Sequence, residues 1–333
     1  MHPPSSKTQD LAQLYATELQ PILDQLEAKR QEARKRALLS LGVLLPVALL
    51  LMLIVGNAFG IIFAIFLGVG ALMAWFGINH GVQKRYRDFF KSEVIARLAR
   101  LVDPSLVYYQ DGGISIEEFR RSNLFRNQID RYRAEDFFTG LIGATEFRFS
   151  EVHAEYKTTT TDSKGRTSTQ WHTIFRGIYF IADFNKHFNG RTYVMPDTAE
   201  RALGGLGRMI QSMFSQIDRR HGELINMEDP EFERIFAVRS TDQIEARYIL
   251  STSLMRRLTE FRQQLNKPVA IAFVDSQIYI AITTSKDHFE PPSIWRGGGS
   301  LSQDDIAEYF QDVRLAEQIV EDLNLNLRIW TKE

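Results

Sequence analysis

Hydrophobic and polar positions divide the chain into regions with different periods. The stretch Leu38–Asn79 is almost entirely apolar and contains no Asp, Glu, Lys or Arg. A helix rises about 1.5 Å per residue, so about 20 apolar residues cross a hydrocarbon core of roughly 30 Å. We therefore predict a transmembrane hairpin over 37–80, with spans at about 37–55 and 59–78 and a turn at Gly56. The alternative is a buried helical hairpin, which would not need such long apolar segments.

Basic residues stand on both sides of this apolar stretch, whereas the turn inside it has none. The positive-inside bias therefore predicts a multi-pass protein with both termini in the cytoplasm. The flanking residues that carry this prediction are Arg30, Arg34, Lys35 and Arg36 before the first span, and Lys84, Arg85 and Arg87 after the second.

Apolar residues recur at three- and four-residue spacing on either side of the predicted spans. This period predicts amphipathic helices over 10–36 and 81–103, after a disordered N-terminus at 1–9. The two helices either pack together as an antiparallel stalk or lie flat on the membrane. Acidic residues on their polar faces favour the stalk.

From residue 104 onward the pattern is typical of an α+β domain, which we predict over 104–333. Periods of two indicate a mostly antiparallel sheet, and segregated helical segments accompany it. Ser115 and Glu118 form the sequence signature of a capping box at the start of a short helix. Ala144–Tyr156 and Trp171–Asp183 predict a long β-hairpin, with a Ser/Thr-rich tract and a turn at Asp162–Gly165 between them. We also predict a strand over Glu231–Val238.

Composition narrows the classes of function. The net charge is −1, which gives no bulk electrostatic support for a nucleic-acid partner. The chain has no cysteine, which excludes thiolate catalysis, disulfides and Cys-based metal sites. No phosphate-loop, Gly-x-Ser-x-Gly or His-Glu-x-x-His motif occurs, so we expect no cofactor and can name no catalytic residue.

Two sets of side chains are candidates for contact with something other than the chain itself. His153 and Glu155 share a strand face and His172 lies on the facing strand, so the three are candidates for a divalent cation; more often such residues are polar positions on a solvated face. Lys164, Arg166 and Trp171 lie in or beside the hairpin tip, where they could touch a protein partner or anionic lipid headgroups. Alternatively, the charges only keep the tip solvated.

Several stretches together resemble a family of bacterial membrane proteins of unknown function, DUF3137. The residues that carry the resemblance are Phe175–Lys186, Gly190–Asp197, Phe236–Ser240, Glu245–Leu250 and Phe289–Pro291. The similarity covers roughly 130–295. It implies a bacterial inner (cytoplasmic) membrane location and implies no reaction.

These observations favour a membrane-anchored cytoplasmic binding or scaffold module rather than an enzyme. The expected partners are the lipid bilayer, through two spans, and a protein or anionic lipid; the sequence is also compatible with a homo-oligomer. The alternative is an enzyme that acts on a membrane-proximal substrate, with a metal site at His153, Glu155 and His172. A pore or transporter is disfavoured, because the predicted spans hold no ionisable residue.

Overall fold

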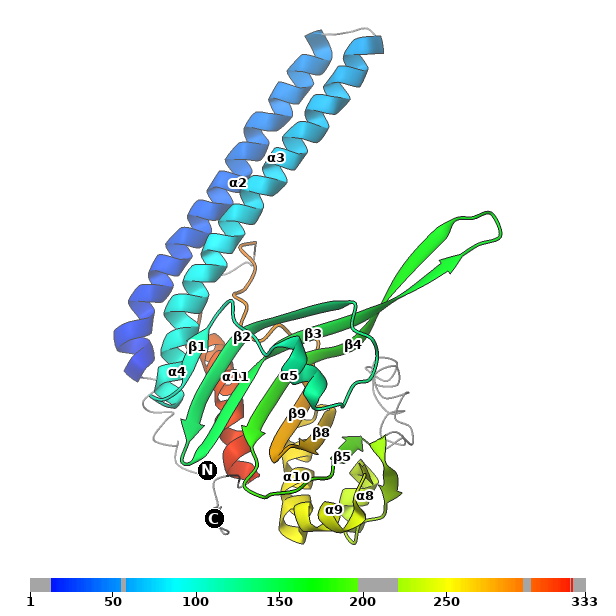
Figure 1. Ribbon diagram of the computed structural model, residues 1–333. Coiled ribbons are helices and arrows are strands. Elements are labelled where there is room, and N and C mark those ends of the chain that lie inside the picture. The colour runs from blue at the N-terminus through cyan, green and yellow to red at the C-terminus, as the bar shows by residue number, and fades with distance from the viewer. Residues whose placement is uncertain (1–12, 55–57, 197–220, 296–300, 324, 326–333) are drawn as a thin grey trace. The chain divides into compact units, whose positions relative to one another are not determined.

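A computed structural model describes residues 13–54, 58–196, 221–295, 301–323 and 325 (Figure 1). The chain forms two compact units. The first contains residues 1–101 and 289–310, and the second contains residues 102–288 and 311–333. The predicted disordered segment 1–9 and the residue at the predicted hairpin turn, Gly56, lie outside the described residues.

Two long helices dominate the first unit. The described helical segments are the π-helical turn η1 (Tyr15–Leu19), α2 (Gln20–Ile54), α3 (Ala58–Phe90), the π-helical turn η2 (Lys91–Ile95) and α4 (Ala96–Val102), whose last residue belongs to the second unit. Helices α2 and α3 run side by side in opposite directions (Figure 1). The Trp75 indole donates to the carbonyl of Ala37 at 3.1 Å, and the Lys29 ammonium lies 4.8 Å from the centre of the Phe89 ring. Pro46 lies inside α2 without ending it.

The prediction of a transmembrane hairpin is contradicted. In the part of the chain that the structure describes, no helix combines the length and the apolar character needed to cross a membrane. A span needs about 20 consecutive apolar residues in one helix. Three predictions are therefore wrong: the spans at 37–55 and 59–78, the bilayer as a partner, and the multi-pass inner-membrane location. The paired helices themselves remain as the scaffold of the first unit.

The strands of the second unit form one antiparallel sheet. Nine described strands take the order β1-β2-β3-β4-β9-β8-β5-β7-β6. Their bounds are β1 Val107–Tyr109, β2 Arg131–Ile142, β3 Thr145–Thr161, β4 Thr167–Asp183, β5 Thr192–Pro196, β6 Glu223–Ile225, β7 Phe236–Ser240, β8 Val269–Val274 and β9 Gln277–Thr283. The predicted mixture of helices with a mostly antiparallel sheet is therefore confirmed.

The centre of this sheet is buried on both faces. Strand β8 is buried along its whole length, and β4 is buried from Ile178 to Ala182, so both strands read as continuous apolar runs rather than alternating ones. On one face, Phe119 of the helix α5 (Ile116–Arg121) packs against Phe175 and Tyr179 of β4. Figure 1 shows α5 lying over this face.

The start of α5 is fixed by the predicted capping box. The Ser115 hydroxyl accepts from the backbone N–H of Glu118 at 3.2 Å, and the Glu118 carboxylate accepts from the N–H of Ser115 at 3.2 Å. These two bonds satisfy backbone donors that a helix start leaves without intrahelical partners. A six-residue helix has few bonds of its own, so this cap and the burial of Phe119 hold it in place.

The predicted strand over Glu231–Val238 is wrong in its first half. Residues Pro230–Ile235 form the helix α8, and only then does β7 begin. Asp229 caps α8, since its carboxylate accepts from the N–H groups of Glu231 and Phe232. Pro230 occupies the first turn, where its missing N–H costs nothing.

Three further helices complete the described fold. They are α9 (Gln243–Ile249), α10 (Thr252–Leu265) and α11 (Gln303–Asp322). Helix α11 begins in the first unit and ends in the second. Within the second unit, the Arg257 guanidinium of α10 donates to the carbonyl of Asp322 at 3.0 Å.

Candidate functional site

The structure brings together two of the three predicted metal-ligand candidates. His153 Nε2 lies 3.7 Å from Glu155 Oε1 on β3. His172 pairs with Tyr156, which is the next residue along β3 and therefore faces the opposite side of the sheet. The His172 ring stacks on Tyr156 with 4.8 Å between centroids, and its Nε2 shares a hydrogen bond of 2.8 Å with the Thr158 hydroxyl. His172 thus belongs to a different environment from His153 and Glu155.

Partial burial lowers the pKa of His153. Three guanidinium groups nearby, those of Arg176, Arg131 and Arg133, act in the same direction, whereas the Glu155 carboxylate acts against them. The folded protein therefore holds this imidazole neutral to a lower pH than the unfolded chain does.

This shift predicts a pH dependence of stability. A depressed folded-state pKa means that the unfolded chain binds the proton first, so the contribution is present above the unfolded value of about 6.5 and is lost as pH falls below it. We expect His153→Gln to reduce the stability lost between pH 7.5 and pH 5.5 in urea unfolding. An unchanged pH dependence in this variant would show that His153 carries no such linkage.

A two-stranded arm extends from the sheet where β3 and β4 pair only with each other. Strand β2 pairs with β3 up to Glu155, and β9 pairs with β4 only from Gly177 onward. Between these points β3 and β4 continue as a ladder to the pair of Thr161 with Thr167 (Figure 1). The arm, defined here as residues 157–171, is exposed at every position.

The predicted hairpin tip is the end of this arm, and it is shorter than the polar tract suggested. The Asp162 carboxylate accepts from the N–H groups of Lys164 and Arg166, and Gly165 has a φ of +74° that the turn requires. The Thr residues around the turn stay in strands because β-branched side chains suit extended backbone. Lys164 and Arg166 therefore lie at the far end of the arm and Trp171 lies at its base.

Side chains at the start of β2 and just before it hold the base of the arm. The Arg131 guanidinium lies 3.9 Å from the centre of the Trp171 ring, and it donates to Glu155 at 3.1 Å. The Asp130 carboxylate accepts from the backbone N–H of Lys157 at 2.8 Å. Beyond these contacts, among the described residues, no third strand pairs with the outer edge of 158–161 or of 167–175.

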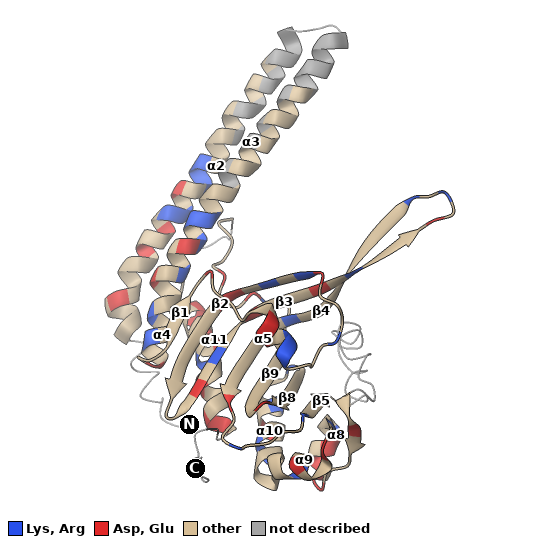
Figure 2. Ribbon diagram, in the orientation of Figure 1, with Lys and Arg blue, Asp and Glu red and all other residues tan. Residues whose placement is uncertain are grey.

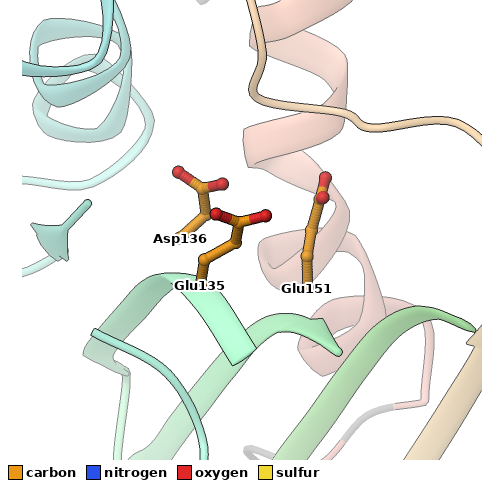
Figure 3. Close-up of side chains that lie close together, drawn as sticks. All are labelled: Glu135, Asp136 and Glu151. Atoms are coloured by element: carbon orange, nitrogen blue, oxygen red, sulfur yellow. The ribbon is translucent and has the colours of Figure 1, made fainter. Parts of the chain in front are cut away.

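Three carboxylates on β2 and β3 form a second cluster. One oxygen from each of Glu135, Asp136 and Glu151 lies within 4.8 Å of the other two, and Figure 3 shows all three side chains pointing away from the sheet on the same side. A β-bulge creates the arrangement: the register shifts between Glu135 and Phe138, and Asp136 takes a left-handed φ of +57°. The sequence does not predict the cluster, because strict alternation along a strand places Asp136 on the face opposite Glu135.

Protein donors already contact each member of this cluster. The Tyr108 hydroxyl donates to Asp136, Arg133 donates to Glu135 at 2.9 Å, and the backbone N–H of His288 donates to Glu151. Carboxylates so placed have the chemistry to ligate a hard divalent cation. The described hydrogen bonds account for the cluster without an ion, and we assign it a structural role.

A chain of ion pairs, buried at His288 and exposed at Lys286, lies next to Glu151. His288 Nδ1 is 2.9 Å from one oxygen of Asp312, and Lys286 Nζ is 2.7 Å from the other. Burial alone would raise the pKa of Asp312, but the hydrogen bonds and charges of His288 and Lys286 outweigh it and lower the pKa. This pairing anchors the second-unit part of α11 to the segment that follows β9.

The basic residues predicted to flank the membrane differ in their surroundings. Arg30 is buried and donates to Glu27 at 2.7 Å, whereas Arg36 pairs with Glu32 on the exposed surface. Arg34, Lys35, Lys84 and Arg85 are not buried. Figure 2 shows that Lys and Arg gather on the halves of α2 and α3 away from their connection.

Comparison with known proteins confirms the resemblance noted in the sequence. The family model described as "Protein of unknown function (DUF3137)" matches residues 173–325. The match includes β4 from Thr173 onward and ends after α11. It leaves out the whole arm and all of β3. No curated protein matches the chain. No solved structure matches it either.

Proposed function

We propose that this chain is a binding module rather than an enzyme, and that it holds a protein partner through the arm of residues 157–171. The observation that carries the proposal is a ladder of paired strands with no neighbour on either edge among the described residues. An isolated two-stranded hairpin is marginally stable in water, and edges of unpaired N–H and C=O groups invite another strand. A strand added to one edge of the arm would therefore stabilise it.

The chemistry of the arm favours one kind of occupant. It carries three basic residues, Lys157, Lys164 and Arg166, and one acidic residue, Asp162 (Figure 2). Its other side chains are mostly Thr and Ser, which leave room beside the backbone. We infer an extended segment of a partner protein with acidic side chains, added to the outer edge of β4 by main-chain hydrogen bonds. The edge of β4 is the longer of the two, since it is open over 167–175.

Site-specific photocrosslinking in cells tests this proposal. A photoreactive amino acid is placed at Thr169 on the arm and, as a control, at Arg256, which is an exposed position on α10 with 68% of its side chain accessible. We expect Thr169 to crosslink to one protein through an acidic, extended segment, and Arg256 not to crosslink to it. Equal crosslinking from both positions, or a contact segment without acidic residues, would contradict the proposal.

A further inference from the structure

A cavity of about 350 Å³ lies within the first unit, between the C-terminal half of α3 and the loop that begins at Glu290. His80, Lys84 and Arg87 line it from α3. Their spacing of four and then three residues places them on one face of the helix. Pro291, Pro292 and Ile294 line the opposite wall. One side of the cavity is therefore basic, and the other offers apolar surface.

The one acidic group in the lining is balanced within the unit. Glu290 Oε1 lies 2.8 Å from Lys91 Nζ, a group with only 3% of its side chain exposed, and 4.0 Å from Arg87 Nη1. Lys91 is one turn beyond Arg87 on the same helix face, so it supplies a charge behind the cavity wall. Arg87 Nε also lies 3.9 Å from Asp88 Oδ1. The basic groups of Lys84, Arg87 and Lys91 therefore outnumber the carboxylates of Glu290 and Asp88.

Lys84 is the basic residue of the lining that is available to bind a ligand. It makes no ion pair with any residue that the structure describes, although several other basic residues of the helical hairpin do. An ammonium group beside a guanidinium is the donor pair that proteins use for phosphate, since lysine acts as a point charge and arginine as a planar fork.

We propose that this cavity binds a phosphate monoester of a small molecule. Lys84 and Arg87 would contact the phosphate oxygens, and Pro291, Pro292 and Ile294 would contact the carbon skeleton. The volume lies at the lower end of the range for small-ligand pockets, roughly 300–1,000 Å³. A dianionic group is attracted more strongly by two positive charges than a single carboxylate is. The site is separate from the arm and does not depend on its proposed role.

Calorimetric titration of the full chain with glycerol 3-phosphate tests the proposal, and glycerol serves as the matched compound without the phosphate. We expect binding of glycerol 3-phosphate only. Lys84→Ala should weaken it by about tenfold or more, because a charge-assisted contact is lost. Arg85→Ala is the matched control: Arg85 is exposed, adjacent in sequence and absent from the cavity lining. It should change the affinity by less than about twofold.

Both substitutions replace exposed side chains, so they should leave the circular dichroism spectrum unchanged. A loss of binding can therefore be distinguished from a loss of folding. Absence of binding by the wild-type chain would overturn the proposal. Equal weakening by Lys84→Ala and Arg85→Ala would also overturn it, since that result describes diffuse attraction to a basic surface rather than a site.

Discussion

Gly177→Ala is expected to destabilise the protein by about 3 kcal/mol or more, because it combines a strained backbone with a backbone collision. Gly177 has a φ of +148°, and a Cβ there would lie 2.0 Å from the carbonyl oxygen of Ile282 and 2.9 Å from the N–H of Thr284. The residue pairs with Val152 of β3 and with Thr283 of β9, at the position where the pairing of β4 with β9 begins. Neither β3 nor β9 can move away without breaking the hydrogen bonds that pair it with its other neighbour in the sheet.

Gly165→Ala provides the control for that prediction. Gly165 also has a positive φ, +74°, but nothing lies within 4 Å of a Cβ placed there. We expect it to cost about 1 kcal/mol or less, which is the penalty for backbone conformation alone. Urea unfolding of both variants measures the difference. A Gly177→Ala variant as stable as Gly165→Ala would contradict the tight packing of β4 against β9.

Replacing the arm by a two-residue Asn-Gly turn between Tyr156 and His172 is expected to abolish partner binding and leave the fold intact. These two residues already pair across the hairpin, so a type I′ turn can join strands at this position. Residues 157–171 are exposed throughout, so their removal should shift the midpoint of thermal unfolding by less than about 3 °C. Affinity for the partner should fall by at least about 100-fold, since the added strand depends on main-chain hydrogen bonds.

Removing only the charges separates two contributions of the arm. The double variant Lys164→Gln, Arg166→Gln keeps the strands and the turn, so we expect weaker binding and less salt dependence rather than complete loss. The affinity for the partner segment is measured by titration, in the same way for the shortened protein and for the double variant. If the shortened protein bound as tightly as the wild type, the partner would contact another surface.

Much of the fold follows from local patterns in the sequence. The capping box at Ser115 and Glu118 and the turn at Asp162–Gly165 are where periodicity and turn chemistry placed them. Each of these features depends on residues close together in the chain. The order of strands that are distant in sequence could not be predicted. Strand β5 lies between β8 and β7, and no local signal specifies that position.

The errors also have physical causes. Alternation in Glu231–Val238 suggested a strand, but Asp229 and Pro230 together start a helix and prevail over it. A bulge places Asp136 beside Glu135, which a period of two does not predict. The apolar stretch was read by its length and composition as two membrane spans, which the helices described by the structure do not support. The arm was predicted as a hairpin tip, but its length depends on Thr-rich strands that a polar pattern obscured.

Hydrogen–deuterium exchange on the wild-type chain tests whether a partner strand pairs with the outer edge of β4. The measurement compares the amides of residues 167–175 alone and with the partner segment that crosslinks to Thr169. In the free protein, outward-facing amides on this edge should exchange rapidly, since no described strand pairs with them. We predict that the partner segment protects alternate amides along this edge. Protection elsewhere in the sheet, with exchange over 167–175 unchanged, would contradict it.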